Sequence, residues 1–505
     1  MAIRFNFAID VVERLGRERP GDEALRAIAT SGNRESLTFA EVAEGADNVA
    51  AGLAAAGVGK GDVVMTMIGA RPEWVLATLG TWRLGAVALP GAEQLRAADI
   101  ALRIDNAKPI LLLIAERDRR EVEGALRLAQ HAPRVLEIDR GLPTGAPIDP
   151  SPTITDDAAL IVFTSGSGGE PKGVVHTQGY LLGQRLQAEH WYDARPGELA
   201  WCTAASGWSL SSRNAFVAPW ITGAACLLHD ARFDPGERLE IVAAEGINVL
   251  CQSPTEYRMI AKHAQLVDWR SPALRHMLSA GEPLNPEIIA TFHAATGLDI
   301  SDGYGQTETG AVAGTPPGSE ARPGSMGMPL PGCAVEVLDP AGEAAEQGEM
   351  CMDPATIPTF FAGYLNEDPI DRAARWHTGD RVRRDSDGHL WFEGRIDDVI
   401  VSAGYRIGPF EVESALVSHP AVAEAAAVAA PDDERGSIVK AVVVLRDGHR
   451  GNDRLARDLQ DHAKQVTAPY KHPRAIEFRD ELPKTSSGKI KRAALRAEAA
   501  GAAQR

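Results

Sequence analysis

The sequence predicts an α/β protein with a large N-terminal α/β domain, a β-rich subdomain and a small α+β C-terminal domain. Three observations lead to this prediction. The chain has 505 residues, more than one ordinary hydrophobic core accommodates, so two or more cores are expected. Short apolar runs alternate with helical stretches over the first two thirds, which is typical of βα units. The character of the sequence changes after about residue 320 and again near residue 395.

Four apolar runs in the first part of the chain are predicted to be buried strands of one α/β domain. They read VVMTMI, AVALP, PILLLIA and, at residues 158–163, AALIVF. Short continuous apolar runs are expected in parallel strands that are covered on both faces. A helix is predicted over TQGYLLGQRLQAEHWY, because Thr177 can cap its first turn and the apolar spacing is helical.

The later part of the chain is predicted to form the β-rich subdomain and then the small domain. Residues 321–394 are rich in glycine and proline and contain the strand-like pieces CAVEVLD, GEMCM and HLWFEG. From residue 395 the predicted order is strand, helix, strand, strand, helix, strand. The helices are EVESALVSH and NDRLARDLQDHAKQV, and the later strands are AVAEAAAVAAP, IVKAVVVLR and AIEFRDEL. The chain is therefore divided into domains at 1–394 and 395–505.

The net charge of −17 argues against nucleic-acid binding through a general basic field. A local cluster of basic residues occurs near the C-terminus, and its members are Lys464, Lys471, Arg474, Lys484, Lys489, Lys491 and Arg492. Such a cluster is either a solvated basic tail or a local site for a polyanionic ligand.

Cysteine usage and hydropathy predict a cytoplasmic protein without an integral membrane segment. The five cysteines are scattered and include no C-x-x-C pair, which argues against a disulfide framework or a zinc site and fits a reducing compartment. No apolar run approaches the roughly 20 residues that span a membrane. The N-terminal MAIRFNFAIDVVERLG lacks the apolar region and cleavage site of a secretory signal.

The glycine-rich segment TSGSGGEPKGV, residues 164–174, has the chemistry of an anion-binding loop. It does not match the Walker A pattern, because Gly173 follows Lys172 where a metal-binding Ser or Thr should stand. Glycines let backbone N–H groups converge on oxygens, and Thr164 and two serines add hydroxyl donors. A plain turn needs neither the hydroxyls nor the lysine.

Four further motifs each have an ordinary structural interpretation when taken alone. YGQTETG, at 304–310, is predicted to lie in a loop after the strand GLDIS, and HTGD, at 377–380, could be a simple turn. GRIDDVIVSAGYRIGPFEVE, at 394–413, and PKTSSGKIKR, at 483–492, combine charged residues with flexible glycine-containing loops. Their joint occurrence in this order points to function rather than to structure alone.

The ordered motifs TSGSGGEPKG, YGQTE, HTGD, GRIDD and PKTSSGKI resemble those of the adenylate-forming superfamily, over essentially the whole chain. That superfamily includes acyl-CoA synthetases, luciferases and the adenylation domains of peptide synthetases. The resemblance is closest to medium-chain acyl-CoA synthetases, through WCTAASGW, YGQTETG, GYRIGPFEVESAL and VTAPYKHPR. It implies the acyl-CoA synthetase-like fold, with a mobile C-terminal domain.

The resemblance implies an AMP-forming ligase with two half-reactions. A carboxylate attacks the α-phosphate of Mg·ATP and releases pyrophosphate, and then the thiol of coenzyme A displaces AMP. Lys489, Thr307 and Glu308 would be catalytic, with Glu308 as a ligand of Mg²⁺. By the same resemblance the ATP-binding residues would be Thr164, Ser165, Gly166, Ser167, Gly168, Gly169, Glu170, Pro171, Lys172, Gly281, Glu282, Asp302, Gly303, Tyr304, Gly305, Gln306, Thr307, Asp380, Arg395 and Lys489.

The resemblance also implies that the small domain rotates between the two half-reactions about a hinge at Asp397. This rotation would withdraw Lys489 and present a loop of the small domain to the thiol. The positions that match coenzyme A contacts are Gln94, Ala403, Gly404, Tyr405, Arg406, Arg435, Lys464, His472, Pro473 and Arg474. These contacts would account for part of the basic cluster.

The predicted substrate is a fatty or aryl carboxylic acid. Trp208 matches the acyl pocket of the medium-chain enzymes, although an aromatic there could equally belong to the core. No carboxylate is evident for gripping an amino group, which makes an α-amino acid less expected. A ligase that loads a carrier protein, a luciferase-type oxygenase and a non-catalytic nucleotide-binding relative remain alternatives. The oligomeric state is left open.

The glycine-rich segment departs from the superfamily pattern T-S-G-T-[TS]-G at one hydroxyl position. Gly168 follows Ser167 where a second hydroxyl is usual, and Glu170 adds an anion near a site meant for anions. A more mobile loop and weaker ATP binding are predicted. Gly168→Thr should then lower the KM for ATP.

Overall fold

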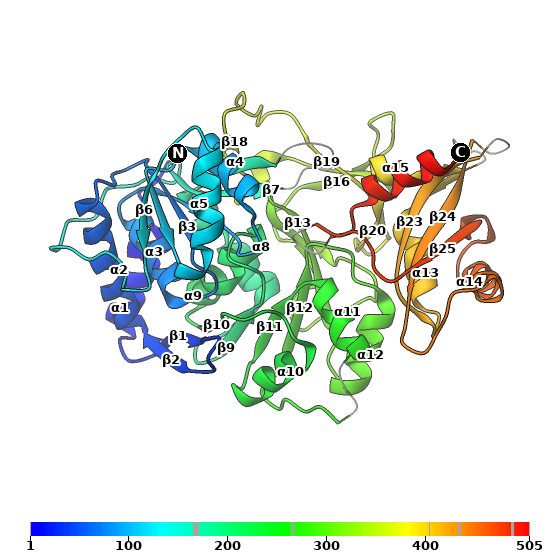
Figure 1. The fold of residues 1–505 in the computed structure, drawn as a ribbon, viewed down its shortest axis with the longest axis horizontal. Coiled ribbons are helices and arrows are strands. Elements are labelled where there is room, and N and C mark those ends of the chain that lie inside the picture. Colours follow the sequence, from blue (N-terminus) through cyan, green and yellow to red (C-terminus); the bar gives the residue numbers. More distant parts are fainter. Residues whose placement is uncertain are drawn as a thin grey trace.

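The computed structural model describes residues 2–164, 171–263, 266, 268–402, 405–432, 436–485 and 489–503. These residues form two large mixed sheets, a four-stranded sheet and a small C-terminal unit (Figure 1). The large sheets lie together at the left and centre of the view, and the C-terminal unit lies at the right. The predicted fold class is therefore confirmed.

One large sheet has the strand order β18-β8-β7-β4-β3-β5-β6. Its strands are β3 (Val63–Met67), β4 (Val87–Pro90), β5 (Leu111–Ile114), β6 (Arg134–Glu137), β7 (Ala158–Thr164), β8 (Lys172–Thr177) and β18 (Gly363–Tyr364). The helices from this part of the chain are α1 (Arg14–Glu18), α2 (Phe39–Ala55), α3 (Pro72–Arg83), α4 (Ala97–Ala107) and α5 (Arg119–Leu128). β7 is parallel to β4, as its apolar run predicts, but antiparallel to β8.

The other large sheet has the order β15-β14-β13-β12-β11-β9-β10-β1-β2. Its strands are β1 (Glu23–Ile28), β2 (Arg34–Thr38), β9 (Leu199–Cys202), β10 (Ala225–His229), β11 (Val249–Gln252), β12 (His276–Ala280), β13 (Ile300–Gln306), β14 (Gly310–Gly314) and β15 (Met328–Pro329). The helices among them are α6 (Gln178–Gly183), α7 (Arg185–Gln187), α8 (Ser209–Ser212), α9 (Ala218–Thr222), α10 (Pro235–Ala244), α11 (Pro254–His263) and α12 (Pro286–Thr296). Thr177 caps α6 as predicted, by accepting the Tyr180 N–H at 3.3 Å.

Two π-helical segments interrupt the helices beside this sheet, η3 (Ala188–Tyr192) and η4 (Arg213–Val217), and a third, η1 (Ala8–Glu13), precedes α1. The short 3₁₀ helices are η2 (Glu116–Asp118), η5 (Pro354–Thr356), η6 (Ile396–Asp398) and η7 (Pro469–Lys471). π-helical turns are rare and occur frequently at functional sites, so η3 and η4 mark a region of interest.

The β-rich stretch forms a four-stranded sheet in the order β16-β17-β19-β20. Its strands are β16 (Val335–Leu338), β17 (Gln347–Met352), β19 (Trp376–Arg384) and β20 (Leu390–Arg395). The C-terminal unit contains β21 (Ile400–Ser402), β22 (Tyr405–Ile407), α13 (Pro409–Val417), β23 (Val422–Asp432), β24 (Gly436–Leu445), α14 (Asp453–Val466), β25 (Ala475–Arg479) and α15 (Arg492–Ala503). The boundary at 394 and 395 remains a prediction.

One local prediction from the sequence is wrong, and the structure decides against two simpler interpretations that the sequence had left open. Tyr304 to Gln306 continue strand β13 instead of lying in a loop, and only residues 307–309 turn. HTGD is not a simple turn, because it belongs to β19. The basic end of the chain is not merely a solvated tail, because residues 492–503 form α15, whose Leu495 packs against β23 and β24.

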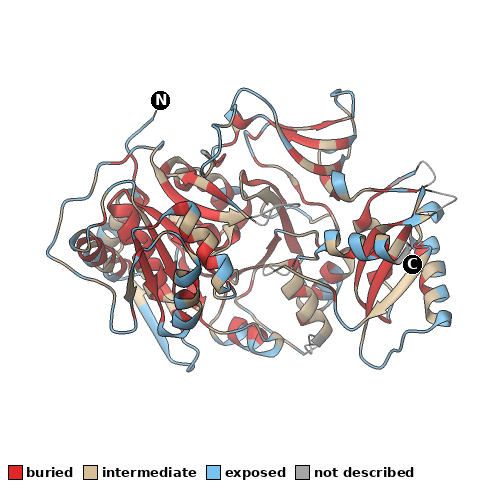
Figure 2. Cartoon of the chain, turned by 45° about the horizontal axis from the view of Figure 1, so that its top comes forward, coloured by how far each residue is buried: buried red, intermediate tan, exposed pale blue. Residues whose placement is uncertain are grey.

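Burial follows the sheets (Figure 2). Red, buried strands fill the interior of the large part, while β23 and β24 form the buried centre of the C-terminal unit and the outer faces of the helices are pale blue. The C-terminal unit has its own apolar cluster around Leu416, Val443 and Leu459. Within the described ranges, no helix combines the length and apolar character needed to cross a bilayer.

Candidate active site

Four residues predicted to bind ATP meet where β13 crosses the end of β19. The carboxylate of Asp380 on β19 accepts hydrogen bonds from the Tyr304 hydroxyl and, at 3.1 Å, from Gln306 Nε2, both on β13. Arg395 at the end of β20 pairs with the other oxygen of Asp380 at 3.1 Å, because residues 380 and 395 are opposite one another in the β19–β20 ladder. The network is therefore built by backbone register and does not depend on flexible loops.

Burial and the surrounding hydrogen-bond donors act in opposite directions on the charge of Asp380. Asp380 is only 5% exposed, and burial raises the pKa of its carboxyl while the Arg395 guanidinium opposes that rise. In turn the Asp380 charge raises the pKa of Arg395 and, with burial, that of Tyr304. Tyr304, Gln306 and Arg395 stabilise the ionised carboxylate against the effect of its burial.

HTGD needs its glycine for this geometry. Gly379 has φ of +67°, and a Cβ there would lie 2.6 Å from Arg395 Nη2. Thr378 is buried next to Gly379. Its carbonyl oxygen accepts a hydrogen bond from Arg395 Nη1 at 2.7 Å. The motif thus shapes the backbone so that Asp380 and Arg395 meet.

Thr307 and Glu308 lie in the turn between β13 and β14, next to the cation predicted to contact phosphate. The Tyr364 hydroxyl donates to Glu308 Oε1 at 2.8 Å, and Lys172 Nζ lies 4.9 Å from the centre of the Tyr364 ring. Lys172 also pairs with Glu367 at 2.8 Å. Tyr364 thus links the glutamate predicted to bind metal to the lysine predicted to bind phosphate.

The phosphate loop itself is anchored by strand pairing. Thr164 at the end of β7 is opposite Lys172 at the start of β8, and Pro171 precedes β8. The predicted site residues Ser165, Gly166, Ser167, Gly168, Gly169 and Glu170 lie outside the described residues, as do Ala403, Gly404 and Arg435. The expectation for Gly168→Thr therefore stays a prediction.

The residues predicted to line the adenine and ribose pocket follow strands β12 and β13. Gly281 adopts φ of +98° just after β12, and Glu282 pairs with Arg258 at 2.7 Å. Asp302 on β13 is buried, burial raises the pKa of its carboxyl, and its Oδ1 accepts the Gly303 N–H at 3.0 Å. Both acids are therefore held before any ligand arrives.

Lys489 lies on a loop closed by an isolated bridge between Lys484 and Ile490. It is exposed, and among the described residues its ammonium forms no ion pair. Three residues later, Arg492 pairs with Glu413 at 2.6 Å, and the negative charge of Glu282 contributes to raising the Arg492 pKa. In Figure 1 the red trace before α15 runs toward β20 and β13, which agrees with this proximity. The loop is thus positioned near the large domain.

Several predicted coenzyme A contacts gather on the C-terminal unit. Tyr405 and Tyr470 stack with ring centres 4.5 Å apart, and both rings are exposed. His472 follows two residues after Tyr470, and the charges of Lys464 and Arg474 contribute to lowering its pKa. Pro473 is buried beside it, and Arg406 belongs to β22. Asp397, the predicted hinge, lies in η6 between β20 and β21.

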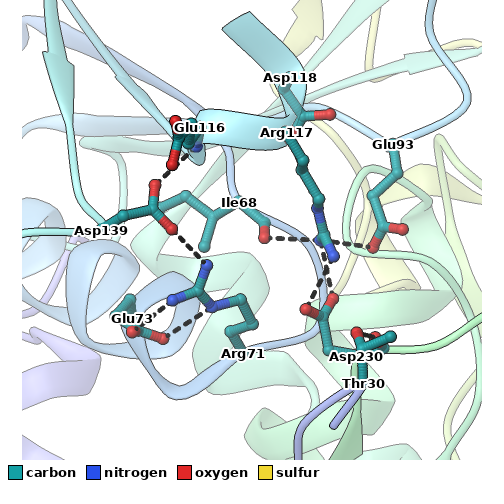
Figure 3. Close-up of polar contacts among 10 residues, drawn as sticks. All are labelled: Thr30, Ile68, Arg71, Glu73, Glu93, Glu116, Arg117, Asp118, Asp139 and Asp230. Carbon is teal, nitrogen blue, oxygen red and sulfur yellow. Dashed lines mark hydrogen bonds and ion pairs between the residues drawn. The ribbon is translucent and has the colours of Figure 1, made fainter.

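Gln94, predicted to contact coenzyme A from the large domain, is exposed on a loop that Arg117 holds. Figure 3 shows Arg117 between Glu93, the Ile68 carbonyl and Asp230. The distances are 3.4 Å to Glu93, 2.9 Å to Ile68 O and 2.7 Å to Asp230 Oδ1. This network fixes the backbone beside Gln94.

Trp208, predicted for the acyl pocket, is the N-cap residue of α8 and is half-buried. It packs against the apolar cluster that contains Ala92 and Leu95. The sequence did not point to Tyr364 or to Arg258. It also did not point to the buried polar side chains without hydrogen-bond partners that follow Trp208 in α8 and η4. The segment FFAGYLNE has no residue pattern that predicts a functional role for Tyr364. The position of Tyr364 depends on the pairing of β18 with β8.

One further group of side chains could hold a metal ion. Glu349, Cys351 and His377 place one ligand atom each within 4.8 Å of one another. Burial raises the pKa of Cys351 to about 12, which disfavours the thiolate that a metal requires. Glu308, with carboxylate oxygens near the nucleotide side, suits Mg²⁺ better.

Comparison with known proteins places this geometry in a family. A model described as AMP-binding enzyme matches residues 12–365, and one described as AMP-binding enzyme C-terminal domain matches residues 411–489. The chain belongs to the AMP-binding enzyme family. The family predicted from the motifs, and the acid–thiol ligase class that it implies, are therefore confirmed.

The relatives share nearly the whole chain. An uncharacterized acyl-CoA ligase of Bacillus subtilis is 39% identical over 92% of this chain and 91% of its own length. The mitochondrial acyl-coenzyme A synthetase ACSM3 of Mus musculus is 36% identical over 97% of this chain and 90% of its own. The crystal structure of the anthranilate CoA ligase AuaEII with anthranoyl-AMP is similar with a TM-score of 0.92 and 27% identity, covering 100% of this chain and 99% of that one. A benzoate CoA ligase from Burkholderia xenovorans has a TM-score of 0.86 and 28% identity, covering 97% and 100%.

Proposed function

We propose that the protein is an AMP-forming acyl-CoA synthetase that activates a carboxylic acid with Mg·ATP and transfers the acyl group to coenzyme A. The observation that carries this proposal is the joining of Tyr304, Gln306, Asp380 and Arg395 into one network beside the Thr307–Glu308 turn. Fixed acceptors and a phosphate-side cation lie in this region, and with Lys489 assigned to the adenylation step they supply the parts that acyl adenylation needs.

In the first half-reaction a substrate carboxylate oxygen attacks the α-phosphorus of ATP. A new oxygen–phosphorus bond forms, the bond to the β-phosphate oxygen breaks, and pyrophosphate leaves with its electrons. Thr164 and Lys172 hold the β- and γ-phosphates, and Thr307 contacts the α-phosphate. Lys489 brings its ammonium between the two negatively charged reactants, whose repulsion would otherwise raise the barrier.

The nucleoside end is held by groups that are paired before ATP binds. Asp380 accepts hydrogen bonds from the ribose hydroxyls through the lone pairs that its protein donors leave free. Arg395 stays with Asp380 and keeps it ionised. Gly281, Glu282 and residues 302–306 form the walls of the adenine pocket.

Glu308 fits the requirements of a Mg²⁺ ligand. Oε1 accepts the Tyr364 hydroxyl at 2.8 Å, and the half-exposed carboxylate keeps coordination capacity on the nucleotide side. Mg²⁺ commonly uses one or two protein carboxylates together with substrate phosphates. When bound, it would neutralise negative charge on the phosphate oxygens.

In the second half-reaction the thiol sulfur of coenzyme A attacks the acyl carbon, the carbon–oxygen bond to AMP breaks, and the thiol proton passes to solvent. We propose that the C-terminal unit, starting at residue 395, rotates about Asp397 between the steps and withdraws Lys489. The stacked Tyr405 and Tyr470, with Lys464, His472 and Arg474, then receive the coenzyme. Gln94 receives it from the large domain.

The proposed compartment is the cytoplasm. The five cysteines are all free and buried, with no disulfide among them. Free buried thiols suit a reducing environment.

Coenzyme A-dependent AMP release tests the proposal. We expect AMP and a thioester from at least one acid in a panel of C2 to C12 and aryl carboxylic acids, with pyrophosphate formed in equal amount. A phosphopantetheinylated carrier protein serves as the competing acceptor, and oxygen consumption is followed in parallel. Transfer to the carrier but not to free coenzyme A, or oxygen uptake, would overturn the acceptor assignment. ATP binding without acid-dependent pyrophosphate release would contradict the proposal that the protein is an enzyme.

A further inference from the structure

Arg213 is a buried arginine without a counter-ion. It is 6% exposed and begins the π-helical segment η4, directly after α8. Its Nε and Nη1 atoms are buried and have no hydrogen-bond partner, and among the described residues it forms no ion pair. A guanidinium remains protonated in proteins, so it cannot escape this situation by losing its proton.

The groups around Arg213 are polar but neutral. Tyr180 lies close enough to Arg213, Gln184 and Ser209 for each of them to influence the pKa of its hydroxyl. His176 stacks on the Tyr180 ring at 3.8 Å, and both of its ring nitrogens are buried without a partner. Burial and the charge of Arg213 lower the pKa of His176 to about 3, so the imidazole is neutral at physiological pH. None of these groups cancels the charge of Arg213.

Further unpaired polar atoms lie on the same elements. Asn214, next to Arg213, accepts from Gln187 Nε2 at 3.0 Å but leaves its own Nδ2 without a partner. Gln184 Oε1, Gln187 Oε1 and Ser211 Oγ are also buried and unpartnered. More than nine in ten buried polar groups in folded proteins are hydrogen-bonded, so this accumulation indicates that something else binds here.

The cluster is connected to the predicted acyl-pocket residue Trp208 and, through neighbouring aromatic residues, to strand β13. Trp208 immediately precedes Ser209, whose hydroxyl is buried near Tyr180 without a hydrogen-bond partner. On the other side, the Tyr192 hydroxyl donates to the Asn214 carbonyl at 2.8 Å. Trp191, beside Tyr192, packs so closely on β13 that a Cβ at Gly303 would lie 2.6 Å from its ring. Trp208 and Arg213 are the N-cap and C-cap residues of α8, so the predicted acyl-pocket residue and the unpaired arginine belong to one short segment.

We propose that the acid activated by this enzyme carries a second carboxylate, and that Arg213 binds this distal carboxylate. The inference rests on the proposed function, because it names the acyl substrate of the same site. Arg213 carries a positive charge, and its Nε–H and Nη1–H groups have no partner and can each donate a charge-assisted hydrogen bond to a carboxylate oxygen. Tyr180, Ser209 and the neutral His176 complete the hydrogen-bonding shell.

A neutral polar group on the substrate would accept hydrogen bonds from Arg213 but would leave the positive charge of its guanidinium uncompensated. Burying an uncompensated cation is far more costly than burying an unpaired dipole, so the ligand that matches the site is an anion. A carboxylate supplies both the negative charge and the acceptor oxygens that the unpaired N–H groups of Arg213 lack.

The test compares straight-chain dicarboxylic acids of C3 to C10 with monocarboxylic acids of equal chain length, by ATP-dependent pyrophosphate release. For wild type we expect kcat/KM for the preferred dicarboxylate to exceed that for its monocarboxylate partner by about 100-fold. Arg213→Leu should reverse most of that ratio, and Arg213→Lys should retain it within about tenfold. Arg185→Leu, on the exposed side of α7, is the control and should leave the ratio unchanged.

Binding without ATP gives a readout independent of catalysis. The preferred dicarboxylate should raise the melting temperature of wild type but not of Arg213→Leu, and equal concentrations of chloride, phosphate or the monocarboxylate should not. An equal shift by chloride or phosphate would mean an adventitious ion only and would overturn the proposal. A wild-type preference for monocarboxylates, or an equal loss of both substrate classes in Arg213→Leu, would overturn it as well. Absence of pyrophosphate release with every acid, while dicarboxylate binding persists, would instead overturn the proposed enzymatic function.

Discussion

The nucleotide side and the acyl side of the site differ in how their charges are paired. On the nucleotide side, Asp380 is buried but receives Tyr304, Gln306 and Arg395. On the acyl side, Arg213 is equally buried, yet two of its nitrogens have no partner. The nucleotide is common to every turnover, so its acceptors are assembled in advance. The charge on the acyl side waits for the ligand that distinguishes one substrate from another.

A second buried arginine, Arg238, can be compared directly with Arg213. Arg238 is also 6% exposed, but its Nη2 pairs with Glu256 at 3.2 Å and its guanidinium lies 4.4 Å from the Trp201 ring centre. Burial alone therefore does not explain an unpaired guanidinium in this protein. Arg238 is a structural cation, whereas Arg213 has the environment of a binding group.

The largest expected effect is a difference in the free energy of unfolding between variants of Arg238 and Arg213. Arg238→Met leaves Glu256 without its cation and should lower the free energy of unfolding by about 3 kcal/mol. Arg213→Met removes a cation that has no counter-ion, so it should leave the ligand-free protein unchanged or stabilise it by about 1 kcal/mol. Urea denaturation of both variants measures this. Equal destabilisation would mean that Arg213 is paired in the free protein.

The next largest effect is expected on the nucleotide side, where Asp380 is paired. Asp380→Asn removes a charged acceptor from the network and should raise the KM for ATP about 100-fold, while the KM for the acid stays within about threefold. Asp387→Asn, an exposed aspartate after β19, is the matched control. Initial rates of pyrophosphate release over a range of ATP concentrations provide the measurement. An unchanged KM for ATP would remove Asp380 from the ribose site.

A smaller effect is expected at Tyr364, which links Glu308 and Lys172. Tyr364→Phe keeps the ring beside Lys172 but deletes the hydrogen bond to Glu308, so kcat/KM for ATP should fall about 5- to 10-fold. Tyr364→Leu removes the ring as well and should lose more. If the two variants were indistinguishable from wild type at several Mg²⁺ concentrations, the link between metal and phosphate residues would be absent.

The smallest effect is a pH dependence beside Gln94. Burial raises the pKa of Asp118 to about 6, although Arg117 opposes the rise. Between about pH 4 and 6 the folded protein keeps a proton that the unfolded chain has lost, so this group's contribution to stability falls as pH rises. After allowance for solvent screening, Asp118→Asn should be more stable than wild type at pH 7 by about 1 kcal/mol and should converge with it below pH 4. Asp139→Asn, at a carboxyl whose pKa is lowered by its hydrogen bonds to Glu116 N–H and Arg71, should show the opposite sign.

The fold and the nucleotide side could be predicted from the sequence because their signals are local and ordered. Apolar runs marked β3, β4, β5 and β7, and the motifs named the residues that meet at Asp380. The strand character of Tyr304–Gln306 and of HTGD could not be predicted, because glycine-rich segments have weak strand propensity and here are held by their neighbours in the sheet. Helix α15 was missed because its charge, rather than its alanine content, dominated the interpretation.

The acyl side could not be predicted, because its decisive feature is an absence of partners. Arg213 stands in SLSSRNAF like any arginine, and only the packing of α6, α8 and η4 shows that no carboxylate reaches it among the described residues. Tyr364 is similar, since its role depends on a two-residue strand, β18, pairing with β8. Long-range register and burial are not encoded in any short motif.

The two half-reactions of Lys489→Ala test the central claim most directly. Acyl-adenylate formation from ATP and acid should fall by about 10³-fold or more, because the proposed role of the Lys489 ammonium is to neutralise the charge between the attacking carboxylate and the α-phosphate. Thioester formation from supplied acyl-adenylate and coenzyme A should stay within about threefold of wild type, because the proposed rotation withdraws Lys489 in that step. Equal loss in both half-reactions, or an unimpaired first one, would contradict the account.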